Sequence, residues 1–77
     1  MRKVFVDVTA TFTKDGNVLP VNFIWEDGRQ YTVDKVLDKR KAASFKVGGH
    51  GIRYTCRILG KQTYLFLEDG RWFVEAN

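Results

Sequence analysis

The sequence predicts an all-β protein: a small SH3-like barrel or a strongly coiled antiparallel meander of five to six strands, with at most one short helical turn. Three observations favour this class. Apolar residues recur at every second position along most of the chain, as in strands that bury one face. Glycines follow aspartates between these segments, as at hairpin turns. A short meander of this kind usually closes on itself, because closure removes exposed sheet edges.

The alternating segments cover residues 3–12, 19–25, 31–37, 52–58, 63–67 and 72–74. In residues 52–58, Ile52, Tyr54, Cys56 and Ile58 share one face, whereas the two arginines of this strand lie on the other. In residues 19–25, the side chains of Leu19, Val21, Phe23 and Trp25 are predicted to share one face. The period breaks at residues 36–37, where valine and leucine are adjacent, so we expect a bulge or sharp bend there.

The positions of the glycine residues predict where the turns lie. Asp15-Gly16, Asp27-Gly28 and Asp69-Gly70 fit type I′ turns, and Gly60-Lys61 fits a type II′ turn. Residues 34–45 are the best candidate for a helix, but Arg40 and Lys41 occupy positions where an inward helical face needs apolar side chains. We therefore expect an extended, bent strand followed by a basic loop, with one helical turn as the alternative.

Length and composition indicate one domain, residues 1–77, held together by apolar packing. A single cysteine and a single histidine supply neither an internal disulfide nor a structural zinc site, and we expect no cofactor. The lone cysteine is typical of a reducing, cytoplasmic setting. Nothing at the N-terminus resembles a signal peptide, and no apolar run approaches the ~20 residues that cross a bilayer.

No arrangement of residues favours catalysis, and no small-molecule substrate is evident. His50 lies in a glycine-rich stretch, residues 48–51, where a flexible hairpin tip explains it better than a general base. Cys56 falls on the apolar face of its strand, so we expect a buried, unreactive thiol. Most carboxylates belong to turns. We therefore expect a binding module and not an enzyme.

Two stretches resemble a known family. Residues 20–37 follow the pattern P-x-x-F-x-W…G-x-x-Y-x-V-x-x-V-L, and residues 64–75 add an aromatic strand, a glycine turn and a Trp-Phe strand. This pattern resembles small bacterial β-barrel domains, some encoded beside or fused to Y-family-type DNA polymerase homologues. Residues 1–13 and the basic residues after Leu37 depart from it. The resemblance implies a barrel fold and no catalytic residues.

The charge is concentrated in one segment. The chain has a net charge of +4, yet residues 38–61 carry seven basic residues and one acidic residue. We expect a positive face that binds DNA or RNA through backbone phosphates, with Phe45 stacking on a base. The alternative is a solvated face that keeps the protein soluble and protects a sheet edge. The predicted nucleic-acid site comprises Lys39, Arg40, Lys41, Phe45, Lys46, Arg53, Arg57 and Lys61.

A second hypothesis assigns the binding role to the N-terminal strand. Most aromatic residues fit the core, but Phe5 lies opposite the apolar face of this strand. Such a strand can pair with a second copy of the chain or with a protein partner. Phe5 and Val6 are the residues predicted to make that contact.

Overall fold

A computed structural model describes residues 2–41 and 51–76, and these residues form seven strands and no helix. The strands are β1 (Arg2–Phe12), β2 (Val18–Ile24), β3 (Gln30–Thr32), β4 (Lys35–Lys41), β5 (Gly51–Ile58), β6 (Lys61–Glu68) and β7 (Arg71–Ala76). They form one antiparallel sheet in the order β3-β2-β1-β7-β6-β5-β4. The all-β prediction is confirmed. Five to six strands were predicted, and the described residues form seven, because the expected third strand is divided into β3 and β4.

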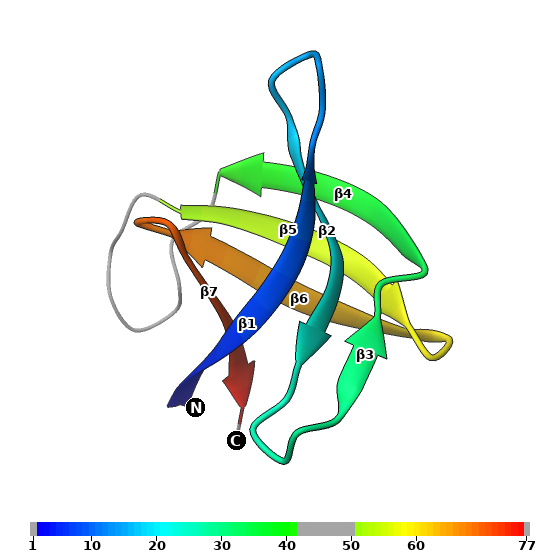
Figure 1. The fold of residues 1–77 in the computed structure, drawn as a ribbon, viewed down its shortest axis with the longest axis vertical. Helices are drawn as coiled ribbons and strands as arrows, with labels where there is room; N and C mark the ends of the chain where they lie inside the picture. The colour runs from blue at the N-terminus through cyan, green and yellow to red at the C-terminus, as the bar shows by residue number, and fades with distance from the viewer. Residues whose placement is uncertain (1, 42–50, 77) are drawn as a thin grey trace.

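The sheet is curled into a half-barrel (Figure 1). Its two edges are β3 and β4, which are consecutive in the chain, so the sheet must bend round to bring them together. The linking residues are anchored on both sides: the Val33 amide donates to the Val21 carbonyl of β2, and the Asp34 amide donates to the Arg57 carbonyl of β5, each at 2.8 Å. These two hydrogen bonds draw the opposite halves of the sheet together.

Strand β1 belongs to both halves. Residues Arg2–Val6 pair with β7, and residues Asp7–Phe12 pair with β2. Because of this change of partner, β1 and β2 cross in front of β5 and β6 in Figure 1. The apolar core lies on the concave face of the curled sheet, which we call the inner face. Its most buried members are Phe23, Tyr54, Cys56, Ile58 and Leu65.

The predicted irregularity at residues 36–37 is confirmed. Val36 is opposite Cys56 and Asp38 is opposite Thr55, so Leu37 has no partner on β5. A second register shift lies between β1 and β2, where Val21 is the residue passed over. Val21 is therefore 38% exposed, and the prediction that it shares the inner face with its odd-numbered neighbours is wrong. A bulge inserts one residue and reverses the alternation on either side of it.

The turns fall into two kinds. Asp69 and Gly70 both have positive φ, as the predicted type I′ turn requires. At Gly16 and Gly28 only the glycine has positive φ, so the type I′ predictions there are wrong. The backbone hydrogen bonds Gly28 N–H to Trp25 O and Trp25 N–H to Arg29 O instead indicate the longer loop that ends in a glycine bulge.

A second apolar layer covers the convex, outer face of the sheet. Phe66 and Phe73 face each other across β6 and β7 with ring centroids 5.0 Å apart, and Phe5 meets Phe73 edge-on at 5.7 Å. The Lys3 ammonium lies 4.6 Å from the Phe73 ring centroid. Phe66 and Phe73 are buried. Two-sided burial of β6 and β7 increases the apolar area that this short chain removes from water.

The predicted burial of Cys56 is confirmed, and it has a consequence at high pH. Burial raises the pKa of this thiol to about 11, above the ~8.5 of a free thiol. Above the ordinary pKa the unfolded chain ionises first, so the stability that the neutral thiol provides is lost as pH rises towards 11. Thermal unfolding followed by circular dichroism should show a falling Tm over this range. The decline of Tm with pH should be shallower in Cys56→Ala. Equal slopes in the two proteins would mean that the Cys56 thiol does not cause the decline.

Candidate functional site

The pairing of β4 with β5 arranges several basic side chains on the outer face. Arg40 is directly opposite Arg53, and Lys35 is directly opposite Arg57. These positions alternate with the inward-facing Tyr54 and Cys56, so their side chains lie on the convex side of the sheet. Four of the six cations on these two strands thus lie on the outer face, together with Asp38, the one acidic residue of the two strands.

Contacts among these side chains leave most of the positive charge available. Arg40 forms an ion pair with Asp38, with 2.7 Å between Arg40 Nε and Asp38 Oδ2. The hydrogen bond from Arg40 lowers the pKa of the Asp38 carboxyl and raises the pKa of the guanidinium. Arg53 lies over the Tyr64 ring, 4.6 Å from its centroid. The Nε of Arg53 is buried and meets no acceptor among the described residues.

Tyr64 completes an outer basic face, which we define as Lys35, Arg40, Arg53, Arg57 and Tyr64. Tyr64 is directly opposite Thr55 on β6, and it is 39% exposed. An aromatic ring beside guanidinium groups offers a stacking surface next to positive charge. Sequence reasoning missed Lys35 and Tyr64, because their grouping with the arginines depends on the pairing between strands. For Lys35 that pairing includes the bulge between Val36 and Asp38, whereas Tyr64 is placed by the regular pairing of β5 with β6. The alternation of β6 was the available signal for Tyr64.

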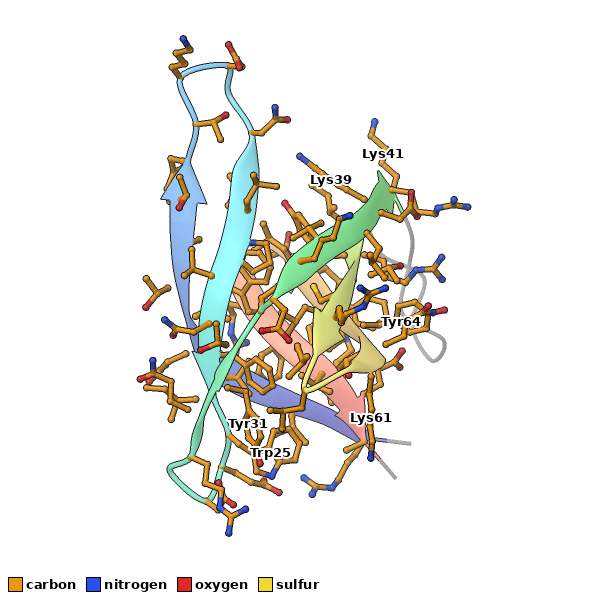
Figure 2. The ribbon with its side chains drawn as sticks, turned by 90° about the vertical axis from the view of Figure 1, so that its right-hand side faces the viewer. Trp25, Tyr31, Lys39, Lys41, Lys61 and Tyr64 are labelled. Carbon is orange, nitrogen blue, oxygen red and sulfur yellow. The ribbon has the colours of Figure 1, made fainter. Side chains whose placement is uncertain are left out.

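Other residues of the predicted nucleic-acid site lie elsewhere. Lys39 and Lys41 are opposite the inward-facing Tyr54 and Ile52, and Lys39 reaches Asn17 Oδ1 at 3.3 Å. Figure 2 places Lys39 and Lys41 towards one end of the molecule and Lys61 towards the other, with Tyr64 on the outer side. The single continuous surface predicted for these lysines and arginines is therefore divided. The predicted residues Phe45 and Lys46, together with His50, lie outside the described residues.

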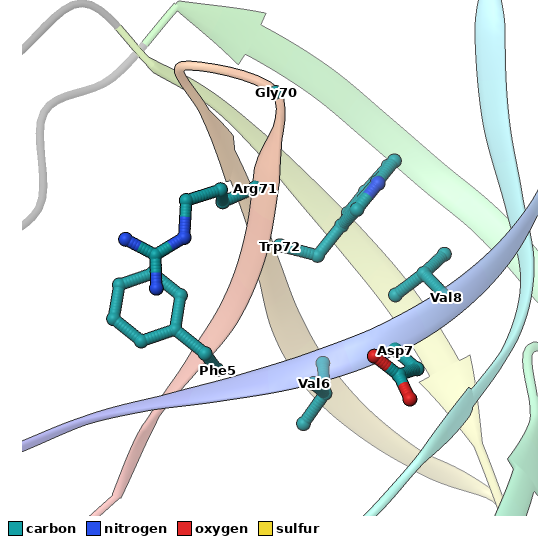
Figure 3. A pocket seen from close by; sticks show the side chains of 7 residues that line it. All are labelled: Phe5, Val6, Asp7, Val8, Gly70, Arg71 and Trp72. Carbon is teal, nitrogen blue, oxygen red and sulfur yellow. The ribbon is translucent and has the colours of Figure 1, made fainter.

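Phe5 and Val6 line a shallow hollow of about 410 Å³ where β1 leaves β7 (Figure 3). The Arg71 guanidinium covers the Phe5 ring at 3.8 Å from its centroid, and Val6 packs against the inner core. Strand β1 lies inside the sheet, paired along each half of its length. Association through this strand stays a prediction, with Phe5, 47% exposed, as its most accessible residue.

Comparison with models of known protein families finds none that matches this chain. Comparisons with curated proteins and with solved structures find no match either. Over residues 2–41 and 51–76 there is no helix with the length and apolar character needed to span a membrane.

Proposed function

We propose that the protein is a non-catalytic binding module that takes single-stranded DNA or RNA on the outer basic face. One observation carries the proposal: Arg40 opposes Arg53, and Lys35 opposes Arg57, on adjacent antiparallel strands. Like charges directly opposite one another destabilise a sheet. In the free protein the Asp38 carboxylate pairs with Arg40, so part of the repulsion remains. A bound polyanion would remove that remaining repulsion, which favours the complex.

The composition of the face supports a single strand more than a duplex. Arg53 and Arg57 are four residues apart on β5, a separation of ~13 Å between Cα atoms, so they reach phosphates of different nucleotides. Tyr64 lies beside these cations on the next strand, β6, and the part of its ring that Arg53 leaves exposed can stack on an unpaired base. Bases in a duplex are already stacked on each other and are not available to it. We place this role in the cytoplasm, since Cys56 is a lone buried thiol.

Fluorescence anisotropy with a fluorescein-labelled 15-nucleotide oligo(dT) tests the proposal. Four phosphate contacts give a slope of log affinity against log salt of about −3 for a single strand. Arg57→Gln should weaken binding and make that slope shallower by about 0.7. Tyr64→Ala should weaken binding by about 1–3 kcal/mol, the usual contribution of one stacked base, and leave the slope unchanged.

Arg29→Gln is the matched control, because Arg29 is exposed in the turn before β3 and pairs with Asp27. It removes the same charge from the protein and should leave affinity and slope close to those of the natural chain. If Arg57→Gln and Arg29→Gln lose the same amount of affinity, the binding is a non-specific attraction by net charge, and the proposed face is wrong. Circular dichroism of each variant establishes that the fold is retained.

A further inference from the structure

A pocket of about 420 Å³ lies at the end of the half-barrel away from Lys39 and Lys41. Phe23, Trp25 and Tyr31 line one side of it, from β2, the following turn and β3. Leu59, from the turn between β5 and β6, and Lys61, the first residue of β6, line the other side. Its volume falls in the range of ~300–1,000 Å³ that is usual for small-ligand sites, and its mostly apolar lining is also typical of them.

Leu59 is an unusual residue for its position. Leu59 and Gly60 both have positive φ, at 52° and 73°, between the paired residues Ile58 and Lys61. This corrects the predicted Gly60-Lys61 turn. The β6–β7 turn has the same conformation with Asp69, whose φ is 53°. Aspartate and asparagine tolerate this region because of their short polar side chains, whereas leucine rarely adopts it.

Leu59 is also 74% exposed, so in the free protein it combines backbone strain with an apolar side chain in water. Residues with a strained backbone concentrate at ligand sites, where the need to bind the ligand outweighs the conformational preference of the residue. Leu59 stands at the rim of an aromatic pocket. A ligand that fills the pocket covers the leucine side chain, and burial of that side chain then favours binding.

The polar groups of the pocket indicate the charge of the ligand. Among the described residues that line it, Lys61 carries the only charge, and Trp25, Tyr31 and Thr63 have the uncharged polar groups. Lys61 makes no ion pair with any residue in the described part of the chain. A single cation beside three aromatic rings is complementary to a ligand with a flat apolar body and one negative charge.

We propose that this pocket binds a small aromatic carboxylate. The ring of the ligand lies against Trp25 and Tyr31 beneath Leu59, and its carboxylate faces the Lys61 ammonium. The site is separate from the outer basic face and does not depend on nucleic-acid binding. Aromatic rings provide most of the contact area, and the lysine distinguishes an acid from a neutral molecule of the same shape.

The first test is an NMR titration of the whole protein with 2-naphthoate, followed through the indole N–H signals. The Trp25 signal should shift and saturate, whereas the signal of Trp72, which lines the hollow near Phe5, should not. Leu59→Asn should raise the Tm, because asparagine suits positive φ, and should weaken 2-naphthoate binding by about fivefold or more through lost apolar contact. We therefore expect this variant to be more stable than the natural chain and to bind 2-naphthoate more weakly.

The second test separates charge from shape. 2-Naphthamide should bind the natural chain several-fold more weakly than 2-naphthoate, and Lys61→Gln should abolish that difference without changing the affinity for the amide. Lys14→Gln, in the distant β1–β2 turn, is the matched control, and this variant should keep the difference in affinity between acid and amide. Equal binding of acid and amide, or a shift of Trp72 alone, would overturn the proposal. So would a dimer in sedimentation that Leu59→Asn dissociates, because the pocket would then be filled by a second copy.

Discussion

Replacing Phe73 by alanine is expected to destabilise the protein by about 3–5 kcal/mol, the usual cost of removing a buried aromatic ring. Phe73 is fully buried, although it lies on the outer face of the sheet. Its ring stacks on Phe66, meets Phe5 edge-on and lies beneath the Lys3 ammonium. A small domain has a total stability near the lower end of ~5–15 kcal/mol, so this variant should be close to unfolding at room temperature.

Urea denaturation followed by circular dichroism measures the effect, and Phe12→Ala supplies the control. Phe12 is also a phenylalanine on a strand, but it is 79% exposed at the end of β1. Its replacement should change stability by no more than about 0.5 kcal/mol, as is usual for an exposed site. Similar costs for the two variants would mean that the outer aromatic layer does not stabilise the fold. Phe73→Leu keeps most of the apolar volume and provides a folded variant for comparison.

Replacing Tyr54 by alanine is expected to have an effect of similar size, about 3–5 kcal/mol, for a different structural reason. Tyr54 is fully buried on β5, its ring packs 5.3 Å from that of Trp72, and its hydroxyl donates to the Val18 carbonyl at 2.6 Å. Val18 begins β2, which lies across the half-barrel. This side chain therefore joins two parts of the sheet that do not pair with each other.

Tyr54→Phe separates the hydroxyl from the ring. It should cost about 1–2 kcal/mol, because the ring is kept but the Val18 carbonyl loses its donor in a partly buried place. The two variants should be compared by urea denaturation under identical conditions. If Tyr54→Phe is as stable as the natural chain, the hydrogen bond does not contribute to closure and only the packing of the ring does.

Local features of the fold were readable in the sequence because they depend on neighbouring residues. Alternation identified the inward face of β5, and the adjacent Val36 and Leu37 indicated a bulge, which is present. Turn types were harder to predict. Aspartate followed by glycine is compatible with both a two-residue turn and a longer loop with a glycine bulge, and the lengths and twist of the flanking strands decide between them.

The candidate sites could not be predicted without knowing the register between paired strands. The basic segment supplied most of the correct cations, but alternation on β4 is interrupted by the bulge at Leu37. Arg40 is consequently placed beside Arg53, whereas Lys39 and Lys41 face the opposite side. The aromatic pocket was not predicted. Trp25 and Tyr31 come from one half of the sheet and Leu59 and Lys61 from the other, and no local pattern shows that the sheet curls far enough to bring them together.

The amino-acid pattern was enough to predict the class of fold, the inward faces of most strands, the buried thiol of Cys56 and the location of the excess positive charge. All of these follow from side-chain alternation and composition along a short stretch of chain. Three features became visible in three dimensions: the division of the basic residues between two faces, the aromatic layer on the outer face and the pocket beside Leu59. These depend on which distant strands pair, in which register, and on the curvature of the sheet that joins them.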